Sequence, residues 1–145
     1  MPILLNDTAS HCSYCDSFPL LKSSKTIDHF LPKSEYPGQA YDWTNLYLSC
    51  RECQANKDVH VSEYLLRPDD ENYDFSDFFI IDFTEFKLLA NPMSTNETQL
   101  KAQTTINILN LNSSEFITAR RHSYSREKEV GFNKEDFAFR YLFYD

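Results

Sequence analysis

Four cysteines, arranged as two pairs, constrain this chain more than any other feature of its sequence. Cys12 and Cys15 form one C-x-x-C unit, Cys50 and Cys53 form another, and residues 16–49 lie between the two units. A turn of this length presents two thiolates to one ion, and two such turns build a tetrahedral zinc site. We therefore expect a structural zinc ion bound by these four cysteines. Redox-active dithiols or unliganded cysteines remain the alternative interpretation.

The apolar runs of the sequence bear on whether the chain enters a membrane or is exported. Residues 2–5 are too short an apolar run for a signal peptide, and no stretch approaches the roughly 18 apolar residues that span a bilayer. We therefore expect a cytoplasmic protein with no membrane partner. In a reducing cytoplasm, paired cysteines bind metal rather than form disulfide bonds.

The charge of the chain bears on what it can bind. Its 145 residues are enough for one globular domain, and their formal net charge is −8. Proteins that grip nucleic acid unaided do so with clustered lysine and arginine, so this balance argues against a stand-alone nucleic-acid clamp. Much of the acidity falls in residues 69–85, which we interpret as a solvated surface. Repulsion of nucleic acid, or docking to a basic partner, is the alternative.

Apolar patterning predicts an α+β protein. Residues 26–31 and 46–48 predict two short strands, and residues 54–64 predict a helix. This order places a zinc-stapled core in residues 1–66. Residues 67–145 are expected to form a C-terminal extension, mostly helical, that packs on the core and docks a partner.

The second half has its own pattern. Residues 78–83 and 86–89 predict a hairpin, and residues 98–111 predict an amphipathic helix. Asn112 is expected to cap a further helix, because a glutamate follows it three residues later. The aromatic-rich residues 137–144 are expected to pack on the core or to bind a partner.

A string of polar residues lies between and after the cysteine pairs. Asp28-His29 falls on the first expected strand, Asn45-Leu46 precedes the second cysteine pair, and Lys57 follows that pair. This order resembles the zinc-containing branch of the HNH endonuclease family. The resemblance implies a ββα-metal core, in which a two-stranded hairpin and a helix surround a catalytic metal ion.

Longer stretches narrow the resemblance. They are residues 27–34, 43–50, 88–92 and 105–112, and Arg120-Arg121. Together they resemble the HNH subunit of Septu anti-phage systems, the PtuB type, also found as an effector in some retrons. The resemblance implies a bacterial nuclease acting on nucleic acid, with DNA favoured over RNA. It also implies an ABC/SMC-like ATPase partner of the PtuA type, which would grip the nucleic acid that an acidic chain cannot hold.

The resemblance also implies roles for single residues. His29 would be the general base that takes a proton from the attacking water. Asp28 would hold the catalytic Mg²⁺ or Mn²⁺, and Asn45 would orient His29. Neighbouring strand residues face opposite sides, so Asp28 and His29 meet at one site only where the strand twists or ends. For Asn45, a cap of the loop without catalytic consequence is the alternative.

Gln54 departs from the family pattern. The family usually has asparagine or histidine at this position, as the second ligand of the catalytic metal. Asp28 and Gln54 are therefore the candidate ligands, while Asn56, Asp58 and His60 lie close enough in sequence to substitute. Asn56 is a poor replacement, because it lies on a different face of the expected helix. An altered metal site, weakened catalysis or lost activity are the three consequences to weigh.

Two further hypotheses follow from the same residues. The chain could be an inactive zinc-stapled scaffold in such a complex, a hypothesis that draws on Gln54, the acidity and the small size of the chain. The zinc ion itself is expected to be structural, because four thiolates leave no open position for water. His11, beside Cys12, is a rival zinc ligand, although we favour its interpretation as a polar residue that flanks the turn. An independent restriction enzyme would need a basic helix or arm to read sequence, and we find none.

Overall fold

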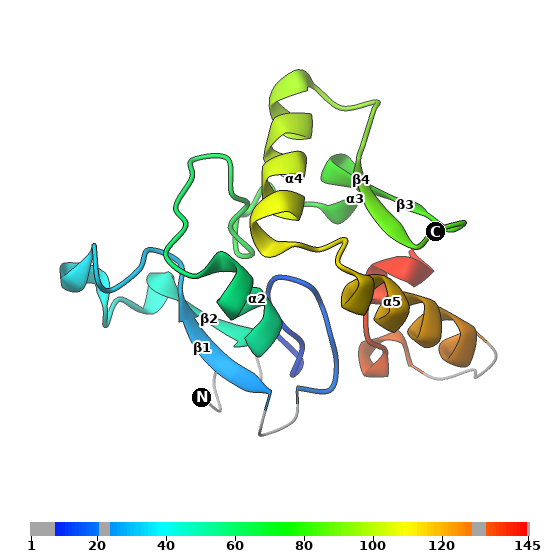
Figure 1. The fold of residues 1–145 in the computed structure, drawn as a ribbon, viewed down its shortest axis with the longest axis horizontal. Coiled ribbons are helices and arrows are strands. Elements are labelled where there is room, and N and C mark those ends of the chain that lie inside the picture. Colours follow the sequence, from blue (N-terminus) through cyan, green and yellow to red (C-terminus); the bar gives the residue numbers. More distant parts are fainter. Residues whose placement is uncertain (1–7, 21–23, 129–132, 145) are drawn as a thin grey trace.

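Short strands and helices alternate along the chain in the computed structural model, which describes residues 8–20, 24–128 and 133–144. Two antiparallel hairpins form within these residues, and the predicted α+β class is confirmed (Figure 1). The strands are β1 (Lys25–His29), β2 (Leu46–Cys50), β3 (Phe79–Asp82) and β4 (Lys87–Ala90). The helices are α2 (Arg51–Lys57), α3 (Phe75–Phe78), α4 (Asn96–Leu109) and α5 (Ser114–Glu127), with 3₁₀ turns at η1 (Pro37–Gln39), η2 (Trp43–Asn45), η3 (Lys134–Asp136) and η4 (Arg140–Phe143).

The first hairpin and α2 make a ββα unit. β1 and β2 pair antiparallel, with Asp28 opposite Tyr47 and His29 opposite Leu46. Helix α2 follows β2 directly and packs on the hairpin (Figure 1). The long connection between the strands carries η1 and η2. Asn45 is the last residue of η2 and stands directly before β2.

The predicted helix over residues 54–64 is wrong in its bounds. It begins earlier because Cys50 is its N-cap, with the Cys50 side chain accepting a hydrogen bond from the Cys53 backbone N–H. It ends at Lys57 because Asp58 takes a φ of 46° and a ψ of −123°, which leaves the helical region.

The second half centres on α4. The predicted hairpin is present as β3–β4, with Ile80 opposite Leu89. Thr95 caps α4 by accepting a hydrogen bond from the Thr98 N–H, and Asn110 ends the helix in the left-handed region. Asparagine tolerates that region better than most residues, which explains the sharp stop.

The expected cap of the next helix lies one residue off. Ser113 is the N-cap of α5 and accepts from the Phe116 N–H at 3.3 Å. Asn112 instead pairs with β4, accepting from the Leu88 N–H and donating to the Leu88 carbonyl, both at 2.8 Å. Its side chain therefore ties the α4–α5 turn to the second hairpin.

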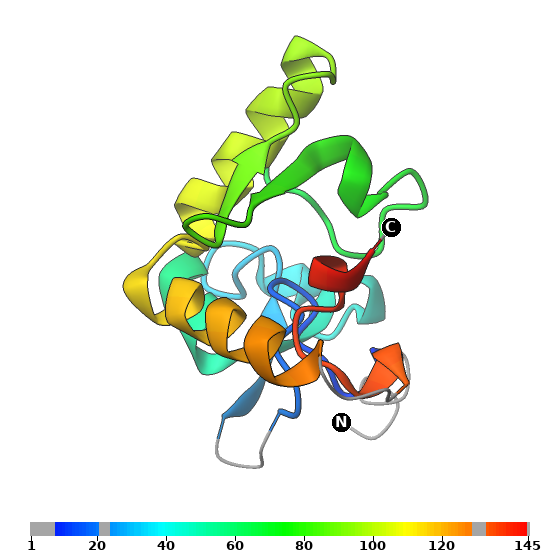
Figure 2. The same cartoon turned by 90° about the vertical axis from the view of Figure 1, so that its right-hand side faces the viewer.

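The two halves share one set of buried side chains. Asn56 of α2 donates to the Leu109 carbonyl at the end of α4 at 2.9 Å. The segment 137–144 returns to the first cysteine pair, where the Phe139 N–H donates to the Asp16 carbonyl at 2.8 Å. Figure 2 shows this segment (red) beside the blue N-terminal part and α5 (orange). The boundary at residue 66 stays a prediction.

No helix within the described residues is both long and apolar enough to cross a membrane.

Candidate metal centre and active site

The four cysteines converge at one buried point. Their Sγ atoms all lie within 4.8 Å of one another, and all four residues are buried. The Sγ atoms of Cys15 and Cys50 are 3.7 Å apart, far beyond the roughly 2.05 Å of a disulfide bond. A tetrahedron with metal–sulfur bonds of about 2.3 Å has edges of about 3.8 Å, close to this separation. The predicted four-cysteine metal site is therefore confirmed as a geometry.

The backbone around the cluster is shaped for metal-bound sulfur. The first knuckle (residues 12–15) is a turn before β1, and the second knuckle (residues 50–53) joins β2 to α2. The Cys50 N–H donates to Cys12 Sγ at 3.3 Å, and the Cys53 N–H donates to Cys50 Sγ at 3.4 Å. Contacts with the neighbouring thiols hold the pKa of the Cys50 thiol well below its ordinary value, whereas burial raises the pKa of Cys15 and contacts with the other thiols raise the pKa of Cys53. Four buried thiolates this close repel one another, and a divalent cation between them relieves that repulsion.

His11 does not point into the cluster. Its ring is 1% exposed, with Nδ1 2.8 Å from the Ala9 carbonyl oxygen and Nε2 2.8 Å from the Phe137 carbonyl oxygen. Both nitrogens thus face carbonyl groups, and the imidazole connects the first knuckle to the segment 137–144. The four cysteines remain the ligand set.

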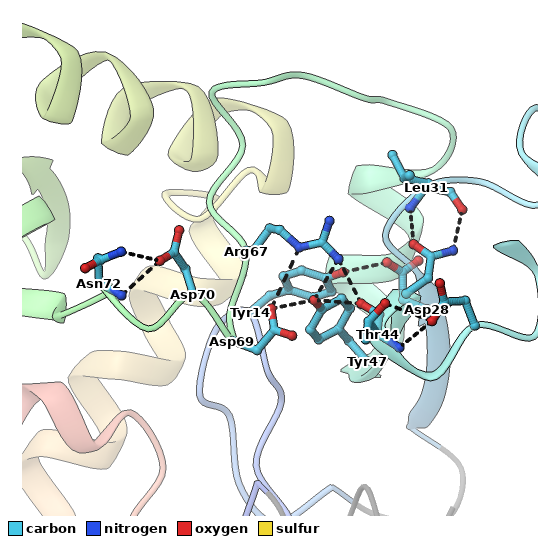
Figure 3. Close-up of polar contacts among 11 residues, drawn as sticks. Tyr14, Asp28, Leu31, Thr44, Tyr47, Arg67, Asp69, Asp70 and Asn72 are labelled. Atoms are coloured by element: carbon cyan, nitrogen blue, oxygen red, sulfur yellow. Dashed lines mark hydrogen bonds and ion pairs between the residues drawn. The ribbon is translucent and has the colours of Figure 1, made fainter.

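Asp28 lies in a buried polar network. The Tyr14 hydroxyl donates to Asp28 Oδ2 at 2.6 Å, and Lys57 Nζ lies 3.2 Å from the same oxygen (Figure 3 shows Tyr14 beside Asp28). The Lys57 and Asp28 side chains are 0% and 5% exposed. Burial raises the pKa of Tyr14 far above its ordinary value, so the hydroxyl stays a donor. The charge of Asp28 is therefore compensated inside the protein.

His29 takes the last position of β1 and is half-buried. Its Nε2 lies 2.9 Å from the Ala40 carbonyl oxygen. A carbonyl only accepts, so we assign the proton to Nε2, which leaves the lone pair on Nδ1. Within the described part of the chain, Nδ1 has no hydrogen-bond partner. The imidazole is thus oriented through one nitrogen, while the other is available to accept a proton.

Asn45 holds the connection that contains Ala40. It is 1% exposed, accepts from the Leu31 N–H at 2.8 Å and donates to the Leu31 carbonyl at 3.0 Å. The same amide donates to the Gln39 carbonyl at 3.2 Å. One side chain therefore fixes the connection just after His29 and again next to Ala40, the residue that accepts from the imidazole.

Gln54 faces the first hairpin. Its Nε2 donates to the Ile27 carbonyl of β1 at 3.1 Å, three residues before Lys57 on the same side of α2. Of the substitutes considered, Asn56 is engaged with Leu109, and Asp58 and His60 are exposed. Gln54 is therefore the amide of α2 that the fold turns toward the Asp28 strand.

The donor chemistry around Asp28 fits a hard divalent cation. Asp28 Oδ1 and Gln54 Oε1 accept no hydrogen bond from the described residues, and carboxylate and amide oxygens are suitable ligands for Mg²⁺ or Mn²⁺. Lys57 competes with a cation for the negative charge of Asp28. The contacts of Tyr14 and Lys57 with Asp28 were missed from the sequence. For the Lys57 contact, the sequence did offer a signal: Lys57 follows Gln54 by three residues, which places both side chains on the same side of a helix.

Comparison with known proteins agrees with this geometry. Residues 12–59 match the HNH endonuclease family model, a segment that contains the four cysteines, Asp28, His29, Asn45 and Gln54. This part of the chain is an HNH endonuclease domain, with the ββα core stapled by a four-cysteine metal site.

The likeness extends to a defence protein. Over 113 residues the chain is 30% identical to the Septu protein PtuB of Bacillus thuringiensis, an alignment that includes 75% of this chain. The chain spans 39% of the length of that relative.

Proposed function

We propose that this chain is a metal-dependent HNH endonuclease that hydrolyses phosphodiester bonds of nucleic acid. The observation that carries the proposal is the state of His29. Its Nε2 is held by the Ala40 carbonyl at 2.9 Å, and its Nδ1 is left as an acceptor on the edge of an HNH domain. A neutral imidazole oriented in this way is suited to take a proton from water as the water attacks phosphorus.

The other residues support that step in different ways. Asn45 keeps the Ala40 carbonyl in place and so preserves the orientation of His29. Asp28 and Gln54 would hold the catalytic Mg²⁺ or Mn²⁺, which supplies positive charge for the phosphate oxygens when bound. Tyr14 and Lys57 keep the Asp28 carboxylate in one position.

The four-cysteine site is proposed to hold zinc with a structural role. Thiolates favour zinc among the common cellular divalent ions, and four of them leave no coordination position for water or substrate. The ion would join the turn before β1 to the β2–α2 junction, and so fix the hairpin against the helix.

The biological setting is proposed from the relative. By likeness to the Septu protein PtuB, the chain would be the nuclease subunit of an anti-phage complex in the bacterial cytoplasm. A net charge of −8 indicates that another subunit grips the nucleic acid, and an ATPase of the PtuA type fits that need. DNA is favoured over RNA as the substrate.

A second candidate function is a catalytically weakened scaffold in the same complex. It is favoured by two observations: Lys57 already compensates the charge of Asp28, and Gln54 stands where the family has asparagine or histidine. A scaffold would bind the partner and the structural metal without cutting nucleic acid.

Cleavage of plasmid DNA and total RNA, with added Mg²⁺ or Mn²⁺ and with or without the ATPase, decides between the two. We expect His29→Ala to lower the cleavage rate by about 10²–10⁴-fold, since that is the usual contribution of a general base. Zinc content and the cooperative fold should be retained. His122→Ala, an exposed histidine of α5, is the matched control and should cut like the wild type. Equal cleavage by His29→Ala would disprove its role, and no cleavage by the folded wild-type complex would favour the scaffold.

A further inference from the structure

A cavity of about 520 Å³ lies between the first hairpin and the C-terminal half of the chain. Its volume falls within the range of roughly 300–1,000 Å³ typical of small-ligand sites. Aromatic side chains from both halves form its walls, namely Tyr14, Trp43, Tyr47, Tyr73, Phe75 and Tyr144. Such walls suit a flat, conjugated ring rather than an aliphatic chain.

A few polar groups interrupt the aromatic lining on one side. The Tyr47 hydroxyl donates to Asp69 Oδ1 at 2.6 Å, and Arg67 Nη2 donates to the Tyr47 hydroxyl at 3.2 Å. Figure 3 shows Arg67, Asp69 and Tyr47 grouped together beside Tyr14. The group presents both donors and acceptors, which is what the edge of a nucleobase requires.

The cavity is one side chain away from the candidate active site. Tyr14 forms part of the cavity wall, while its hydroxyl donates to Asp28 at 2.6 Å. Trp43 and Thr44 also line it, immediately before Asn45 in the chain. The Tyr14 side chain therefore separates the cavity from the site where cutting is proposed to take place.

We propose that this cavity binds an unpaired nucleobase of the strand that the HNH domain cuts, an inference that rests on the proposed nuclease function. The base stacks on the aromatic walls, and Asp69 and Arg67 bond to its edge. Stacking on aromatic rings does not depend on net charge, so it lets an acidic chain bind nucleic acid. Unpaired bases are selected because a base inside a duplex has no free face to stack.

The fluorescence of the single tryptophan of the chain reports directly on binding of a base in the cavity. Trp43 is 50% exposed and lines the cavity, so a base stacked there quenches its fluorescence. His29→Ala protein, without added Mg²⁺ or Mn²⁺, is titrated with single-stranded oligothymidylate, a blunt mixed-sequence duplex, and free thymidine monophosphate. Tryptophan amide under the same conditions corrects for absorption by the nucleotides. We expect saturable quenching by the single strand and none by the duplex.

Matched variants test whether the quenching comes from binding in the cavity. Tyr144→Leu removes a half-exposed ring of the wall, and Tyr73→Leu removes a second one. Each should raise the Kd for the single strand about tenfold, as loss of one stacking partner does. Tyr41→Leu, at a tyrosine 97% exposed and outside the cavity, should leave the Kd unchanged.

Other results overturn base binding in the cavity, the nuclease function, or both. Equal quenching by duplex and single strand, or equal Kd values for all three variants, would remove the cavity from nucleic-acid binding. Saturable binding of thymidine monophosphate with no response to the single strand would assign the cavity to a free nucleotide. Cleavage by the wild type without any Trp43 response would reject the cavity while leaving the nuclease in place. Quenching by the single strand in a complex that never cuts would keep the cavity as a base-binding site and reject the nuclease function.

Discussion

At the scale of single residues, the ion pair between Lys57 and Asp28 sets the character of the site. The Lys57 ammonium is fully buried and contacts both Asp28 Oδ2 at 3.2 Å and the His29 carbonyl oxygen at 2.8 Å. Breaking a buried pair by removing one partner costs about 3–5 kcal/mol, because the other charge is left uncompensated. Loss of Lys57 would therefore leave the Asp28 carboxylate buried without its partner at the end of β1.

Tyr14 offers a test of this network. We predict that Tyr14→Phe lowers the free energy of unfolding by about 1.5–3 kcal/mol, the usual worth of a hydrogen bond to a charged group. The ring stays, and the cysteines on either side are untouched, so the bound metal should be retained. Urea denaturation and metal analysis measure the two quantities. Tyr41→Phe, at an exposed position, is the control, and equal stability of the two variants would contradict the prediction.

The sequence was sufficient to predict some of these residues and not others. The cysteine cluster followed from spacing alone, because a C-x-x-C turn constrains its own geometry. Tyr14 and Asp28 are 14 residues apart, and only the folded chain brings the knuckle turn over β1. The roles of His29, Asp28, Asn45 and Gln54 stay predictions, which the cleavage variants test.

At the scale of elements, α2 depends on its surroundings. It has 7 residues, far fewer than the roughly 12–15 that a helix needs to be stable alone in water. Cys50 is both its N-cap and a member of the metal cluster, and Cys53 lies in its first turn. The metal site and the helix therefore form together.

We predict that Cys50→Ser abolishes stoichiometric zinc binding and unfolds the ββα unit. Structural zinc contributes about 10–16 kcal/mol of apparent binding free energy, as much as or more than the 5–15 kcal/mol of a whole domain. Metal analysis and circular dichroism of the purified variant measure the outcome. Removal of the metal from wild-type protein with a chelator should reproduce it. A folded, cooperative Cys50→Ser protein would contradict this view of α2.

Element types were easier to predict than element ends. The hairpin at β3–β4 and the long helix α4 follow from apolar patterning, which depends on burial of one face. The bounds of α2 and the cap of α5 depend on local choices: Cys50 serves as a cap, and Asn112 is engaged by Leu88 of β4. Such tertiary partners do not appear in a local pattern.

At the scale of the whole molecule, the segment 137–144 joins the C-terminal half to the first knuckle. Arg140 forms a forked ion pair with Asp16, with Nη2 2.6 Å from Oδ1, and a second pair with Glu135 at 2.8 Å. The contact with Asp16 raises the pKa of Arg140 further above its ordinary value. Asp16 itself has a φ of 61°, next to Cys15, so the pair holds a strained turn of the metal site.

We predict that Arg140→Ala destabilises the protein by about 1–2 kcal/mol, less than a fully buried pair because the side chain is partly exposed. Lys101→Ala, which removes a lysine of α4 paired with Glu97, itself 71% exposed, is the control and should cost less than about 0.5 kcal/mol. Urea denaturation compares the two. Equal stability of both variants would show that the segment 137–144 is held by its apolar contacts alone.

The contacts of this segment with the first knuckle have a kinetic consequence. In the pair Asp16–Arg140 the two residues lie 124 positions apart in the sequence, and in the pair His11–Phe137 they lie 126 positions apart. Contacts of such high sequence separation form late, because loop closure must precede them. During synthesis the HNH domain leaves the ribosome well before residues 137–144, so its metal turn is completed only after the rest of the chain has followed. The proposed nuclease would therefore stay unfinished while the chain is still attached to the ribosome.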